Sequence, residues 1–255
     1  RHYRIFDQGQ VLNDISAVYV EWRTEPDSVI QYAKRALDCY AAVESVPDMQ
    51  WPFFTEAKAS ALINLGYGYE MKGALSEAER CFRQALRLLE GIREGLQEEL
   101  GAGVSAAEQP YFIAEFGYLG GALNNAINGL SITLVGEGRY LEAEQLLQQA
   151  IERDTWLKAL QPGYVQASIL LGSDYYNLAK AYFRQERYRE ALDYNEQAIQ
   201  ELQPSQPAAP GQAGFYVYND LYWIEAQTGK ARCLQQLMDT EAALETTSLA
   251  LQHIN

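Results

Sequence analysis

The feature that most constrains this chain is a set of seven positions that recurs four times at one internal spacing. The copies begin at Leu65, Leu130, Leu178 and Lys230. Counted from that first position, the other six positions lie at +1, +4, +8, +13, +17 and +20. Each copy has a small residue at +1, an aromatic residue or Leu at +4, and Ala at both +13 and +20, and the clearest copy has Gly73 at +8 and Phe82 at +17. The fourth copy is degenerate because it begins with Lys. Repetition at a fixed spacing is the sequence signature of an array of similar structural units.

Each copy is predicted to form two amphipathic helices joined by a short polar turn, such as residues 136–139 or 185–187. In the clearest copy, Gly66 and Ala85 allow the two helix backbones to approach closely, while Tyr69 fills the space beside them. One such αα-hairpin cannot bury its apolar side alone, so several hairpins must stack. The expected fold is all-α, a right-handed α-solenoid of about five αα-hairpins.

The expected organisation is a single array over residues 1–255. Its hairpins are predicted at 1–50, 53–100, 109–158, 164–203 and 215–254, and residues 203–214 form a loop rich in Pro and Gly. The first hairpin is diverged, with helices expected over 11–22 and 27–43. Because the chain begins with Arg1 rather than Met, we expect it to be a segment of a longer polypeptide.

Composition excludes several classes of partner. The net charge of −14 and the pI of about 4.6 argue against binding to nucleic acid, which requires clustered Lys and Arg, and against an anionic membrane surface. No apolar run approaches the ~20 residues of a membrane span. The three cysteines, Cys39, Cys81 and Cys233, are widely spaced and are predicted to be reduced, buried thiols. A cytoplasmic location is therefore expected.

No residue pattern indicates enzymatic chemistry. The two histidines, His2 and His253, stand at opposite ends of the chain without a neighbouring Cys or carboxylate at metal-ligand spacing. No Ser, Cys or Thr has a nearby His that would activate it, and the sequence contains no Gly-rich phosphate-binding loop. We therefore expect no catalytic residue, no metal site and no cofactor.

The four copies resemble the tetratricopeptide repeat (TPR) family, whose members bind other proteins and catalyse no reaction. Residues 63–66 and 176–179, together with Gly138–Glu144, are similar to repeats of kinesin light chain and its bacterial relatives, a variant with extended helices. The resemblance implies a concave groove, lined by the first helix of each hairpin, that binds an extended segment of a partner.

Helical geometry separates the groove-facing residues from those that pack in the core, because successive residues turn by about 100°. The residues expected to contact a partner are Asn64, Tyr67, Met71, Asn125, Asn128, Tyr176, Asn177, Lys180, Phe183, Arg184 and Arg232. Asn64 and Asn177 occupy equivalent positions, and an amide both donates to and accepts from a peptide backbone. The alternative is that these Asn residues hydrogen-bond across adjacent helices and stabilise the stack.

Lys180, Arg184 and Arg232 place three positive charges on the inner side of a strongly acidic chain. This contrast indicates a partner segment that is acidic or carries a free carboxylate. The alternative is that these cations form salt bridges with nearby Glu side chains such as Glu186 or Glu225.

The leading hypothesis is a non-enzymatic scaffold that binds a peptide or protein segment in its groove. Two alternatives stay open. The array could be the sensor or regulatory domain of a larger signalling protein, such as an ATPase-type regulator or a caspase-like protease fused to TPRs. It could also form a homo-oligomer through an exposed terminal hairpin.

Overall fold

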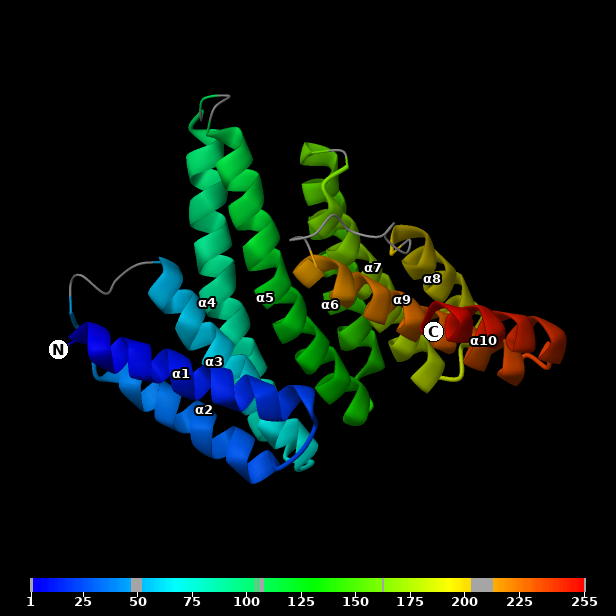
Figure 1. The fold of residues 1–255 in the computed structure, drawn as a ribbon, viewed down its shortest axis with the longest axis horizontal. Coiled ribbons are helices and arrows are strands. Elements are labelled where there is room, and N and C mark those ends of the chain that lie inside the picture. Colours follow the sequence, from blue (N-terminus) through cyan, green and yellow to red (C-terminus); the bar gives the residue numbers. More distant parts are fainter. Residues whose placement is uncertain are drawn as a thin grey trace. The chain divides into compact units, whose positions relative to one another are not determined.

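A computed structural model describes residues 2–46, 52–103, 105, 108–161, 163–202 and 213–254 (Figure 1). Within these ranges the chain forms ten α-helices and no strand, which confirms the all-α class and the expected succession of helical hairpins. The helices are α1 (His2–Glu21), α2 (Pro26–Ala41), α3 (Pro52–Met71), α4 (Leu75–Gly101), α5 (Gln109–Gly136), α6 (Tyr140–Leu160), α7 (Val165–Arg184), α8 (Tyr188–Glu201), α9 (Ala213–Gln236) and α10 (Thr240–Ile254).

The chain divides into two compact units, Arg1–Glu137 with α1 to α5 and Gly138–Asn255 with α6 to α10. The single array over residues 1–255 and its exact hairpin boundaries stay predictions. Most of the predicted Pro/Gly-rich loop, residues 203–212, lies outside the described residues.

In the first unit, α1 packs against α2, and α3 contacts α1, α2, α4 and α5. The first helix begins at His2, so the expected start at residue 11 is wrong. The reason is a buried contact that local spacing does not reveal: the ring of Phe6 lies 5.6 Å from that of Tyr40 on α2. Gly9 lies so close to Tyr40 that a Cβ there would be 2.6 Å from Cε1 of Tyr40.

The small residues of the repeat are required by close helix packing. Phe82 on α4 is fully buried, and its ring lies against Gly66 on α3 and Gly129 on α5. A Cβ at Gly66 would lie 2.8 Å from this ring, and a Cβ at Gly129 would lie 2.2 Å from it. One aromatic side chain therefore fills the space between three helices because two of them lack a side chain at that point.

In the second unit, α7 packs against α6, α8 and α9, and α9 packs against α10. The fully buried Leu202 lies directly beside Gly172 on α7, where a Cβ would be 2.4 Å from Cγ of Leu202. The buried residues around Leu202 include Ala198, Trp223 and Ala226. This cluster joins the end of α8 to α9.

The +8 position of all four copies adopts the same backbone conformation at the end of a helix. Its φ angles are +72° at Gly73, +77° at Gly138, +61° at Glu186 and +63° at Met238. A left-handed residue after the last helical turn reverses the chain direction and is usually Gly. The repeat therefore specifies a turn geometry as well as a packing surface, and the last two copies keep that geometry without Gly.

Candidate functional site

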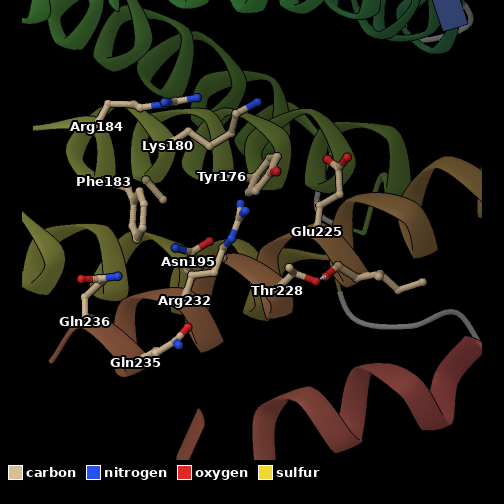
Figure 2. A pocket seen from close by; sticks show the side chains of 13 residues that line it. Tyr176, Lys180, Phe183, Arg184, Asn195, Glu225, Thr228, Arg232, Gln235 and Gln236 are labelled. Atoms are coloured by element: carbon tan, nitrogen blue, oxygen red, sulfur yellow. Dashed lines mark hydrogen bonds between the residues drawn. The ribbon is translucent and has the colours of Figure 1, made fainter. Parts of the chain in front are cut away.

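A pocket of about 570 Å³ lies in the second unit between α7 and α9 (Figure 2). Its lining residues are Tyr176, Ala179, Lys180, Phe183 and Arg184 on α7, Asn195 on α8, and Ile224, Glu225, Thr228, Gly229, Arg232, Gln235 and Gln236 on α9. Five residues predicted from the sequence to bind a partner are among them: Tyr176, Lys180, Phe183, Arg184 and Arg232. The fold thus brings these five side chains together from two helices.

Three positive charges border this pocket. Lys180 and Arg184 are one helical turn apart on α7, and Arg232 extends from α9 toward Tyr176 (Figure 2). Arg184 and Arg232 are exposed and form no ion pair with any residue that the structure describes. Nζ of Lys180 lies 5.0 Å from the centroid of the Tyr176 ring, within the range of a cation–π contact. The salt-bridge alternative therefore does not account for the two arginines.

Glu225 is the one acidic side chain in the lining of this pocket. Burial raises the pKa of Glu225, while the positive charge of Lys180 and a hydrogen bond with Tyr176 act in the opposite direction. Burial, with the charge of Glu225 as the next contribution, also raises the pKa of the Tyr176 hydroxyl. Lys180 is thus partly compensated by Glu225, as the salt-bridge alternative anticipated for this residue.

Asn195 is a lining residue that sequence reasoning missed. Its Nδ2 donates to the carbonyl oxygen of Ala191 at 2.7 Å and lies 3.7 Å from Sγ of Cys233, whereas its buried Oδ1 has no partner among the described residues. A Cβ at Gly229 would lie 2.4 Å from this Oδ1. The sequence did carry a signal for Asn195. The third copy has this polar residue at +17, where the first two copies have the apolar residues Phe82 and Leu147.

In the first unit, Asn64 is buried between α3 and α1. Its Nδ2 donates to Oδ1 of Asn13 at 2.9 Å, and Nδ2 of Asn13 donates to Oγ of Ser60 at 3.0 Å. This arrangement matches the alternative in which the Asn residues bond across adjacent helices. Asn177 on α7 is equally buried, at 7% exposure. Asn13 was not among the residues selected from the sequence, because nothing in its local pattern shows that α1 lies against α3.

Tyr67 joins α3 to α5. Its hydroxyl donates to the carbonyl oxygen of Asn125 at 2.9 Å and accepts from Nδ2 of Asn128 at 3.4 Å. Its ring also meets that of Phe82 at 5.1 Å between centroids. Met71, at the end of α3, is half-buried. A role of these residues in binding a partner stays a prediction, and the contacts show a packing role for Tyr67.

Three further features of the described residues concern metal binding, membrane spanning and the cysteines. No group of three or more His, Cys, Asp or Glu side chains within them is arranged to hold a metal ion. None of the described helices combines the length and apolar character that crossing a membrane requires. The three cysteines are free thiols, with Cys81 and Cys233 buried and Cys39 partly buried.

Comparison with known proteins supports the repeat assignment. The tetratricopeptide repeat family model matches residues 59–91 and 175–201. Two similar solved structures are BtubC (BKLC) from P. vanneervenii and a Podospora anserina protein described as a kinesin light chain with nearly identical TPR-like repeats. The first is 14% identical with a TM-score of 0.53, covering 99% of this chain and 91% of that chain. The second is 16% identical with a TM-score of 0.53, covering 95% of this chain and 92% of that chain.

No curated protein sequence matches the chain at a significant level. At 14% and 16% identity, the two structures establish a shared fold and nothing about partners. The family match places the first and third copies of the seven-position pattern in the same repeat type. The chain therefore carries tetratricopeptide repeats at residues 59–91 and 175–201, as the recurring spacing of its small and apolar residues predicted.

Proposed function

We propose that this protein is a non-enzymatic interaction scaffold whose second unit binds a segment of another protein in the pocket between α7 and α9. The repeats support a role in protein–protein interaction, and the residues that line the pocket support it as the binding site. The observation that carries the proposal is the meeting of Lys180, Arg184 and Arg232 around Tyr176 and Phe183. Cations beside aromatic rings suit a partner that presents both a carboxylate and an apolar or aromatic group.

The charge balance of the chain sharpens this proposal. In a protein of net charge −14, this pocket is lined by three cations and one carboxylate, Glu225, so its side chains carry a net positive charge. An acidic segment, or the free carboxylate at the end of a chain, would be attracted to the positive charge of this pocket and repelled by the acidic remainder of the protein. Affinity should fall as salt is added, because Arg184 and Arg232 are exposed and salt screens exposed charges.

The free thiols support a reducing, cytoplasmic location.

The proposal is tested with peptides selected from a random displayed library against the whole chain and then measured by fluorescence anisotropy. We expect the selected peptides to be enriched in Asp and Glu or to require a free C-terminus. Replacing their carboxylates by amides should lower affinity about tenfold, the equivalent of ~1.4 kcal/mol.

Variants locate the binding. The double variant Arg184→Gln with Arg232→Gln should lose about tenfold or more in affinity for the selected peptides. Each single variant, Arg184→Gln and Arg232→Gln, is also compared with the control Arg189→Gln, which removes one positive charge from an exposed position of α8 that does not line the pocket. Equal losses in the single variants and the control, or selected peptides without acidic character, would contradict the proposal.

A further inference from the structure

Helix α1 of the first unit is apolar on two opposite sides. One side packs in the core and carries Phe6 and Leu12. The other side carries Val11, Ile15 and Val18, and Trp22 continues their line one residue after α1 ends; the spacing of four, three and four residues forms one continuous stripe. Val11 is 58% exposed, Val18 is 42% exposed and Trp22 is 69% exposed. We call these four residues the α1 apolar stripe.

Exposure on the outside of this unit does not by itself explain the α1 apolar stripe. The exposed side of the neighbouring helix α2 is polar, with Gln31, Lys34, Arg35 and Asp38. A contiguous exposed apolar strip bordered by polar residues is characteristic of an interaction surface. Trp is also the residue type that most often dominates the energy of such a surface.

A row of carboxylates runs beside the α1 apolar stripe. Asp7, Asp14 and Glu21 are exposed and lie seven residues apart, which keeps them on one side of the helix. None of the three forms an ion pair with a described residue. We call this row the acidic edge. Because the acidic edge is negatively charged, a partner that packs against the stripe avoids electrostatic repulsion only if its border is neutral or basic.

We propose that the α1 apolar stripe binds an amphipathic helix of a partner protein that carries Lys or Arg along the border of its own apolar face. Apolar side chains spaced at three and four residues would interdigitate with the stripe, and the basic border would pair with the acidic edge. This surface belongs to the first unit and selects a basic partner. It is therefore independent of the pocket in the second unit, which selects an acidic one.

The acidic edge argues against two other occupants. In an antiparallel pair of α1 helices from two copies of this chain, acidic edge would face acidic edge, and each copy carries a net charge of −14. An anionic lipid surface would be repelled by the same carboxylates. A helix with basic residues beside its apolar face would be stabilised both by apolar contact with the α1 apolar stripe and by ion pairs with the acidic edge.

The experiment uses two synthetic amphipathic peptides of equal length, one built of Leu and Lys and one of Leu and Glu, added to the whole chain and followed by fluorescence anisotropy. The Leu/Lys peptide should bind and the Leu/Glu peptide should not. Substituting the stripe, with Val11→Ser, Val18→Ser and Trp22→Ser together, should weaken Leu/Lys binding about tenfold or more. Substituting the edge, with Asp7→Asn, Asp14→Asn and Glu21→Gln together, should weaken it similarly.

A matched control separates this surface from general attraction to an acidic protein. Glu94→Gln, Glu98→Gln and Glu99→Gln together remove the same charge from exposed positions of α4 in the same unit. This control should change affinity by less than about threefold. An equal loss in the control and in the edge variant would overturn the proposal, because the attraction would then be non-specific.

Two further measurements keep the test independent of how the variants fold. A photo-crosslinker on the apolar face of the Leu/Lys peptide should attach to α1 of the unmodified chain, and attachment elsewhere would overturn the proposal. Sedimentation of the chain alone should show no association through the stripe. Self-association that the three Ser substitutions abolish would identify a second copy as the occupant and would also overturn the proposal.

Discussion

Arg153 on α6 and Asp174 on α7 lie side by side in the core of the second unit, with Nη2 of Arg153 3.8 Å from Oδ2 of Asp174. Arg153 is instead committed to Asp154, with Nε 2.6 Å from Oδ1 and Nη2 2.7 Å from Oδ2. Neither oxygen of Asp174 has a hydrogen-bond partner among the described residues. Burial and the charge of Asp154 raise the pKa of Asp174 well above its usual range, and Arg153 offsets this only in part.

This arrangement predicts that Asp174→Asn stabilises the protein at neutral pH. A folded-state pKa above the unfolded value means that the folded chain binds more protons, so stability falls as the pH rises above the unfolded pKa, which is near 4. Asn removes that pH dependence and the cost of burying carboxylate oxygens that accept no hydrogen bond, about 1–3 kcal/mol. Urea unfolding at pH 5 and pH 8 should show the variant gaining relative to the parent as the pH rises. Asp154→Asn, which breaks the pair with Arg153, should destabilise instead.

Gly129→Ala is predicted to destabilise the first unit by about 1–3 kcal/mol, because the new methyl group would overlap the buried ring of Phe82. Gly121→Ala is the control in the same helix. No atom lies within 4 Å of a Cβ at Gly121, so Ala there should stabilise α5 by about 0.5–1 kcal/mol. Thermal unfolding of the two variants separates the effects. A neutral Gly129→Ala would mean that the α4–α5 contact is looser than the structure shows.

Met238→Gly is predicted to stabilise the α9–α10 turn by about 0.5–1 kcal/mol. Met238 is 90% exposed, so removing its side chain loses little packing. Its φ of +63° is a left-handed conformation, which is strained for Met and not for Gly. The reverse change, Gly73→Ala, should cost about 1 kcal/mol at φ +72°, where no atom obstructs the new methyl group. Chemical denaturation measures both. If the left-handed backbone angle is what favours Gly at +8, the two substitutions must change the free energy of unfolding in opposite directions.

Asn64→Ala is predicted to destabilise the junction of α1 and α3 by about 1–3 kcal/mol, because Oδ1 of Asn13 loses its buried donor. Asn125→Ala, on an exposed side chain of the same unit, should change stability little. Melting temperatures give the comparison. If Asn64→Ala leaves the melting temperature unchanged and weakens binding of a selected peptide, Asn64 acts on the partner and its structural role is wrong.

The extent to which the sequence predicted the structure depends on how far each feature reaches along the chain. The repeat spacing predicted the helical hairpins because the pattern that defines each hairpin reaches only from its first position to +20 and recurs along the chain. It did not predict that α1 begins at His2, because Phe6 is held by Tyr40, a residue of the next helix. Lys180 and Arg184 were predicted together because one helical turn puts them on the same side.

The sequence by itself determined the succession of helical hairpins, the polar turns inside them and the small residues that let the helices approach, since these follow from local backbone geometry and the burial of one helix side. Only the tertiary structure decided that Asn195 on α8 lines the pocket together with Arg184 on α7 and Arg232 on α9, and that Asn64 bonds to Asn13. Such contacts join side chains far apart in the chain. Their partners are fixed by which helix faces pack together, a property of the whole unit and of no single segment.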